Sequence, residues 1–187
     1  MNTRPIGMTL IEMMITVAIA GILLGASAPS VNGFITKNQV ASQVNRLVGV
    51  INIARSYAIT RKVVMTLCPS ANGLSCSKNW SQGQILFTDK NHNRIKDNDD
   101  QIIKVLPKLP DNHLLTWKVF QNKKYLQYSP TGITRYQNGT FRYCVDGENL
   151  TYNRALIVSV SGRVRLSQDT NGDGVHEDRD GKPVICR

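Results

Sequence analysis

The chain begins with a long apolar segment that contains a single acidic residue. From Met8 to Ala28 the side chains are apolar or small, and Glu12 is the one acid among them. A run of about 21 such residues is long enough to span a bilayer as a helix. A carboxylate in a membrane-length segment is costly, so we expect Glu12 to have a specific role.

A second helical pattern follows Pro29. Proline removes a backbone donor and bends a helix. Apolar residues then recur at steps of three and four, which is typical of a helix with one apolar face. They are Val40, Val44, Leu47, Val48, Ile51, Ala54 and Ala58. We therefore predict one long, bent helix. Its first half, residues 8–29, is apolar and spans the membrane, and its second half, residues 30–62, is amphipathic and packs on a globular head.

Beyond Lys62 the pattern becomes that of β-strands. Short runs rich in β-branched and aromatic residues alternate with turn signals such as Asn138-Gly139 and Ser161-Gly162. The predicted strands are residues 63–67, 84–87, 101–106, 114–120, 140–145, 155–160 and 163–166. A long helix followed only by short antiparallel strands is an α+β arrangement. We expect residues 63–187 to form a β-rich head on one or two sheets.

Composition and charge suggest a folded protein with an anionic partner. The 187 residues are 41% hydrophobic, and the net charge is +10. Such a charge favours binding to nucleic acid or lipid headgroups. Its distribution is uneven, because acids cluster in residues 89–111 and 169–180. The segment 118–165 between these clusters is strongly basic.

Four cysteines follow the apolar segment, which favours an oxidising compartment and two disulfides. Three pairings are possible. In one of them Cys68–Cys76 closes a short loop, and Cys144–Cys186 holds the tail. Free or metal-binding thiols are the alternative, but the spacings match no standard zinc pattern.

The run Gly7-Met8-Thr9-Leu10-Ile11-Glu12 resembles the leader junction of type IV prepilins. The resemblance implies that a prepilin peptidase removes residues 1–7 by cutting after Gly7, and that the new amino terminus at Met8 is methylated. Glu12 would then pair with the terminal amine of a neighbouring subunit, since both charges need a partner in apolar surroundings. A cleaved secretory signal would instead have a shorter apolar core. A plain membrane anchor, with Glu12 near the headgroups, is the other alternative.

Three later segments resemble the FimT/FimU/GspH class of minor pilins and pseudopilins. They are residues 68–91, the run Phe141–Cys144, and residues 155–169. The resemblance implies the type IV pilin fold, with other major and minor pilins as partners. It also implies an inner-membrane precursor with a single pass and a periplasmic head, which later joins an extracellular pilus.

The run Gly162-Arg163-Val164-Arg165 is the candidate binding motif. Alternate residues of a strand face the same side, so both guanidinium groups would project together toward phosphates. The motif resembles that of FimT-type pilins that bind DNA for natural transformation, which implies double-stranded DNA as a partner. Further candidate cations are Arg154, Arg179, Lys182 and Arg187. In the alternative, Arg163 and Arg165 simply pair with Asp169, Asp173 or Glu177.

The segment 169–180 also resembles a calcium-binding loop. Positions one, three, five, six and twelve of that pattern fall on Asp169, Asn171, Asp173, Gly174 and Asp180. The segment 89–100 matches it more loosely. In the alternative interpretation these are turns in which Asp and Asn bind their own backbone. Calcium is therefore a weak candidate, and no other cofactor is expected.

The sequence contains no recognisable catalytic constellation, so we do not expect an enzyme. We predict a minor pilin of the FimT class that captures extracellular DNA. Two alternatives stay open. One is a structural minor pilin of the FimU kind that primes pilus assembly, and the other is a GspH-like pseudopilin of type II secretion.

Overall fold

The structure is a computed structural model that describes residues 7–134, 136–147 and 149–186. The side chains of residue 24 and residues 26–32 also lie outside the description. The predicted leader is thus represented only by Gly7, and Arg187 is not described. The described elements are α1 (Leu10–Arg61), β1 (Met65–Pro69), η1 (Trp80–Gln82), β2 (Gln84–Thr88), β3 (Ile102–Leu106), β4 (His113–Val119), η2 (Phe120–Asn122), β5 (Leu126–Tyr128), β6 (Gly139–Val145), η3 (Leu150–Tyr152), β7 (Arg154–Val158) and β8 (Val164–Leu166).

The chain divides into two compact units, Met1–Gln39 and Val40–Arg187. The first unit holds the N-terminal part of α1, where large apolar side chains such as Leu10, Ile11 and Ile22 are exposed. Across the side chains that are described, no helix is long and apolar enough to cross a membrane. The membrane segment predicted over residues 8–29 includes Pro29 and other positions outside that description.

The second unit has one main core between α1 and two antiparallel sheets. The helix contributes a buried face with the predicted spacing of three and four residues. Its buried members are Val40, Val44, Leu47, Val50, Ile51, Ala54 and Ala58. Val48, which the periodicity also placed on this face, is only partly buried. The α+β fold expected from the sequence is confirmed.

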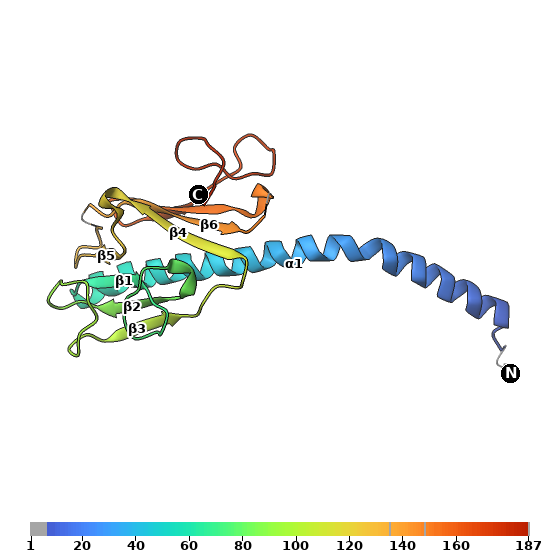
Figure 1. The fold of residues 1–187 in the computed structure, drawn as a ribbon, viewed down its shortest axis with the longest axis horizontal. Coiled ribbons are helices and arrows are strands. Elements are labelled where there is room, and N and C mark those ends of the chain that lie inside the picture. Colours follow the sequence, from blue (N-terminus) through green and yellow to red (C-terminus); the bar gives the residue numbers. More distant parts are fainter. Residues whose placement is uncertain (1–6, 135, 148, 187) are drawn as a thin grey trace, which may run out of the picture. The chain divides into compact units, whose positions relative to one another are not determined.

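The first sheet has the strand order β3-β2-β1-β5 (Figure 1). Both β1 and β2 are buried along their whole length. One face of these strands contributes Leu67 and Leu86 to the main core, and the other face packs Cys68 and Phe87 into a second cluster. The short strand β5, which pairs with β1, was not predicted.

The second sheet has the strand order β4-β6-β7-β8. Its inner face contributes Phe141, which stacks on Trp117 with ring centroids 4.1 Å apart and meets the edge of Trp80 at 4.9 Å. Leu156 and Val158 of β7 extend the same buried face. The opposite, outer face is therefore the part of this sheet that is available to other groups.

The C-terminal tail folds against the outer face of the second sheet. Cys144 of β6 forms a disulfide with Cys186, and the other disulfide joins Cys68 to Cys76. The predicted disulfides are thus confirmed, with the pairing resolved. Figure 1 shows the tail, in red, on the side of β4 and β6 that faces away from β1–β3.

Candidate nucleic-acid interface

The predicted motif begins in a tight turn between β7 and β8. The amide of Gly162 donates to the carbonyl of Ser159 at 2.9 Å, and Gly162 has φ +78°. A Cβ at this position would lie 2.1 Å from the carbonyl oxygen of Gly132 and 2.8 Å from the Tyr128 ring. The Tyr128 hydroxyl donates to the Gly162 carbonyl at 3.1 Å. Glycine is needed here because both the backbone conformation and the close approach exclude a side chain.

The two arginines of the motif flank Val164, with Arg163 immediately before β8 and Arg165 within it. Val164 pairs with Val158 and packs against the core, whereas Arg165 pairs with Ile157. Because strand residues alternate between faces, Arg163 and Arg165 lie on the face opposite Val164. Both are exposed. Both also line one cavity, which agrees with the predicted projection to one side.

A cavity of about 500 Å³ opens beside these arginines. Three cations line it, Arg163 and Arg165 from the motif and Arg179 from the tail, and none of its described lining residues is acidic. Its other lining residues are Asn138, Ile157, Val158, Ser159, Val160 and Val164. The cavity lining therefore combines apolar residues, which we call its floor, with three arginines, which we call its rim.

A second cavity of about 340 Å³ shares Arg179, Asn138, Ile157 and Val158 with the first. Lys118 of β4 and Phe120, the first residue of η2, also line it. We call the two adjoining cavities the basic groove. Lys118, Thr140, Ile157 and Arg165 occupy one row of paired positions across the sheet. That row depends on strand register, so Lys118 and Phe120 could not be identified as groove residues from sequence spacing.

The tail reaches the groove because several bonds fix it to β6. Besides the Cys144–Cys186 disulfide, the Arg142 guanidinium forms an ion pair with Asp178 at 3.1 Å and donates to the Ile185 carbonyl at 3.2 Å. The side chains of this ion pair are only 20% and 11% exposed. These contacts hold Arg179, the residue after Asp178, beside β8.

Two of the predicted cations lie elsewhere. The Arg154 guanidinium donates to the carbonyls of Thr151 and Asn153, both at 2.7 Å, and burial lowers its pKa. Lys182 is exposed and is not among the lining residues of the groove. The structure therefore brings Arg163, Arg165 and Arg179 together, whereas Arg154 and Lys182 lie away from them. Arg187, which was also predicted to bind, lies outside the described residues.

Among the described residues no ion pair joins Arg163 or Arg165 to an acid, although Arg165 lines a further cavity together with Glu177 and Asp178. The ion pairs in this part of the chain are Lys108–Asp111, Arg142–Asp178 and Arg179–Asp180. The Arg179–Asp180 pair is long, at 3.8 Å, and both side chains are about two-thirds exposed (68% and 69%). Such a pair is weak and leaves Arg179 able to bind another anion.

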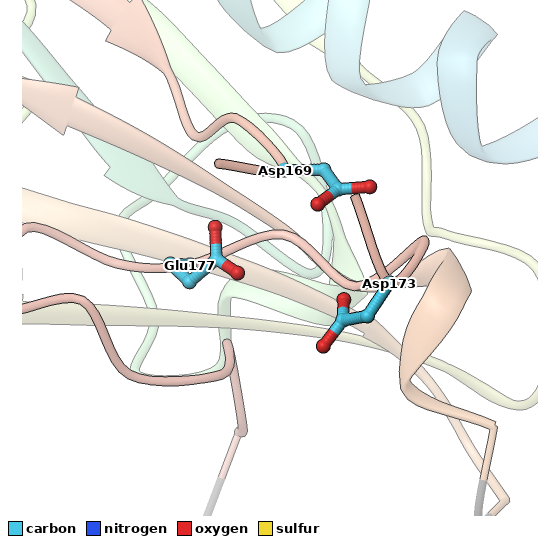
Figure 2. A group of neighbouring side chains, drawn as sticks. All are labelled: Asp169, Asp173 and Glu177. Atoms are coloured by element: carbon cyan, nitrogen blue, oxygen red, sulfur yellow. The ribbon is translucent and has the colours of Figure 1, made fainter. Parts of the chain in front are cut away.

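Three carboxylates of the tail lie close together, but they differ from the predicted calcium ligands. Oxygens of Asp169, Asp173 and Glu177 lie within 4.8 Å of one another, and Figure 2 shows the three groups around a common space. Glu177 takes the place expected for Asp180, which instead lies next to Arg179. The choice of Asp180 as a member of this set is therefore not supported by the geometry.

Backbone donors already bind these carboxylates. The amides of Gly172 and Gly174 donate to Asp169 at 2.7 and 2.8 Å, which lowers the pKa of Asp169 because the bonds favour its charged form. The amide and hydroxyl of Thr170 donate to Glu177. Asn171 likewise accepts from the Asp173 amide rather than pointing its oxygen to the carboxylates. The side-chain–backbone hydrogen bonds of the turn interpretation are present, and calcium binding stays a prediction.

The looser pattern over residues 89–100 also forms side-chain–backbone turns. Buried Asp89 accepts from the Thr66 hydroxyl at 2.8 Å and from the Arg94 amide at 3.0 Å. Asp100 accepts from the amides of Lys90 and Asp97. These acids hold the loop after β2 in place.

Comparisons with known proteins agree with this architecture. Residues 43–162 match the family model described as type II transport protein GspH, and residues 5–28 match the prokaryotic N-terminal methylation motif. No curated protein matches the chain.

Two solved structures illustrate the shared fold. The crystal structure of the type IV minor pilin FimU of Pseudomonas aeruginosa aligns with a TM-score of 0.55 and 19% identity, over 72% of this chain and 92% of that one. The minor pseudopilin EpsH of the Vibrio cholerae type 2 secretion system aligns with a TM-score of 0.50 and 9% identity, over 72% and 99%. Since the GspH model covers more than half of the sequence and the N-terminal motif precedes it, the chain belongs to the type II transport protein GspH family.

Proposed function

We propose that this protein is a minor type IV pilin that binds extracellular double-stranded DNA, without sequence preference, for uptake in natural transformation. The observation that carries the proposal is the cavity lined by Arg163, Arg165 and Arg179, with no acid among its described lining residues. Arginine suits this role because its planar guanidinium group binds phosphate oxygens through two parallel hydrogen bonds.

The spacing of the arginines also suits a phosphate backbone. Residues two apart on a strand are separated by about 7 Å, so Arg163 and Arg165 can contact successive phosphates of one DNA strand. Arg179 supplies a third contact from the tail. None of these contacts distinguishes one base from another, so binding is expected to be independent of sequence.

Three phosphate contacts imply weak and salt-dependent binding by a single head. The logarithm of the association constant should fall with the logarithm of salt concentration, with a slope of about −2.7. Several copies in one filament would raise the overall affinity, because once one head has bound a DNA molecule, the neighbouring heads are already close to the same molecule. Capture by a filament therefore does not require tight binding by each subunit.

In the proposal, the N-terminal segment anchors the head first to the inner membrane and later in the filament. The precursor lies in the inner membrane with its head in the periplasm, and prepilin peptidase cuts after Gly7. Glu12 then pairs with the methylated amine of Met8 on a neighbouring pilin. The match to the N-terminal methylation motif supports the cleavage and methylation, while the pairing of Glu12 is part of the proposal.

The direct test is a fluorescence-anisotropy titration of a labelled 30-base-pair duplex with Arg163→Gln/Arg165→Gln. We expect the affinity to fall about tenfold or more and the salt slope to become shallower by about 1.8, since two phosphate contacts are lost. Lys78→Gln/Lys104→Gln is the matched control, because it removes two exposed charges that do not line the groove. If the arginine variant binds the duplex as the parent does, the proposal is wrong.

A type II secretion pseudopilin is the second candidate, favoured by the GspH family match and the shared fold of EpsH. A deletion strain distinguishes the candidates. Loss of DNA uptake with normal pilus number supports the first, whereas loss of protein export supports the second. Loss of the pili themselves would point to a structural minor pilin that primes assembly.

A further inference from the structure

The floor of the basic groove is more apolar than phosphate binding requires. Four apolar residues line the larger cavity, namely Ile157, Val158, Val160 and Val164. Val158 is 1% exposed and Val164 also packs against the core, so the accessible apolar surface is chiefly that of Val160, which is 53% exposed. A DNA duplex presents phosphates, sugars and base edges to a protein surface, while the faces of its bases remain stacked inside. Duplex binding alone would use the arginine rim and leave this floor in contact with water.

An exposed aromatic ring lies at the other end of the groove. Phe120 is 71% exposed and lines the smaller cavity together with Lys118 and Arg179. An exposed phenylalanine in a positively charged groove is the arrangement with which proteins bind single-stranded nucleic acid. Each unpaired base has a free π-face, and stacking on an aromatic side chain contributes about 1–3 kcal/mol per base.

The two ends of the groove differ in the charge of their lining residues, and this difference matches the charged phosphate and the uncharged base of a single DNA strand. The larger cavity has three arginines and no described acid in its lining. The Phe120 end is also lined by Asp178 and Asp180, which pair with Arg142 and Arg179. A phosphate is therefore favoured at the arginine end, and an uncharged base at the Phe120 end.

We propose that the basic groove binds single-stranded DNA, with phosphates on Arg163 and Arg165 and an unpaired base stacked on Phe120. This inference rests on the proposed DNA-binding function and specifies the form of DNA that the groove prefers. Frayed ends or single-stranded stretches of captured DNA would supply such nucleotides, and the duplex regions would contact only the arginine rim.

The test compares two fluorescent probes, a 15-nucleotide oligothymidine and a blunt 15-base-pair duplex, with the full chain in detergent micelles. Phe120→Ala should lower the affinity for oligothymidine about tenfold and change the duplex affinity by less than twofold, because only unpaired bases can stack. Phe120→Trp should restore oligothymidine binding, and its indole fluorescence should be quenched when the probe binds. Leu74→Ala is the control, since it removes an exposed apolar side chain outside the groove.

The outcomes separate this inference from the proposed function. If Phe120→Ala leaves oligothymidine binding intact, or weakens both probes equally, the single-strand inference is wrong while DNA binding stands. If Arg163→Gln/Arg165→Gln binds both probes as the parent does, the proposed function fails and the inference fails with it. Because Phe120 is exposed, its replacement should leave the thermal unfolding temperature unchanged, so a loss of binding reports on the groove.

Discussion

At the scale of single residues, the motif at positions 162–165 contains three kinds of side chain with different roles. Gly162 allows the turn to lie against Gly132 and Tyr128, and Val164 anchors β8 to the core. Arg163 and Arg165 are left on the outer face. The glycine of the motif is thus explained by packing, and only the arginines are available for the proposed binding to DNA.

This division predicts that Gly162→Ala destabilises the head more than Gly181→Ala does. Both glycines have similar positive φ values, +78° and +72°, but an added Cβ meets nothing within 4 Å at Gly181. The shared backbone strain costs about 1–2 kcal/mol. The clash at Gly162 should add about 1–3 kcal/mol, as in overpacked cores. Urea denaturation measures both free energies of unfolding, and equal losses would show that the close approach to Gly132 is unimportant.

At the scale of elements, the basic groove is assembled by the tail as much as by β8. The sequence separation of the two cysteines is 42 for Cys144–Cys186 and 8 for Cys68–Cys76. The first disulfide holds the segment that carries Arg179, whereas the second closes a loop after β1. The two disulfides should therefore affect stability and binding differently.

Removing each disulfide by a double Cys→Ser substitution tests this expectation. Loss of Cys144–Cys186 should cost about 4 kcal/mol and loss of Cys68–Cys76 about 2.5 kcal/mol, because the longer loop gains more freedom in the unfolded state. In a duplex-binding assay below the unfolding temperature, only the first variant should show a shallower salt slope, through the loss of Arg179. Equal effects of both variants on binding would show that the tail does not contribute.

At the scale of the whole molecule, the residues proposed for assembly and for DNA binding lie in different units of the chain. Glu12 lies in Met1–Gln39, and the basic groove lies entirely in Val40–Arg187. The exposed apolar side chains of the first unit suit burial among neighbouring subunits in a filament. Changes in one unit should therefore leave the activity of the other intact.

Glu12→Gln tests this separation in cells. We expect the variant to be cut after Gly7 and to have a methylated Met8, as mass spectrometry of the purified protein would show. Its incorporation into filaments should fall severalfold, because an uncharged amide cannot neutralise the terminal amine of a neighbouring subunit. The isolated variant should bind duplex DNA like the parent, and normal incorporation into pili would rule out the pairing.

The regular elements were largely predictable because they depend on local periodicity. The apolar face of α1 follows from spacings within one or two turns, and all seven predicted strands overlap strands of the structure. The three-residue strand β5 was missed, since Leu126–Tyr128 is too short to show an alternating pattern. Its pairing with β1, a distant segment, determines its conformation.

The sequence by itself determined the long helix, the strand-rich head, the disulfide-forming cysteines and the alternation that exposes Arg163 and Arg165. The tertiary structure alone decided that Arg179 and Phe120 join them, and that Glu177 rather than Asp180 meets Asp169. The physical reason is the distance along the chain between the residues that interact. Alternation and helical period are set by backbone geometry over a few residues, whereas strand register and the path of the tail bring together residues far apart in the chain.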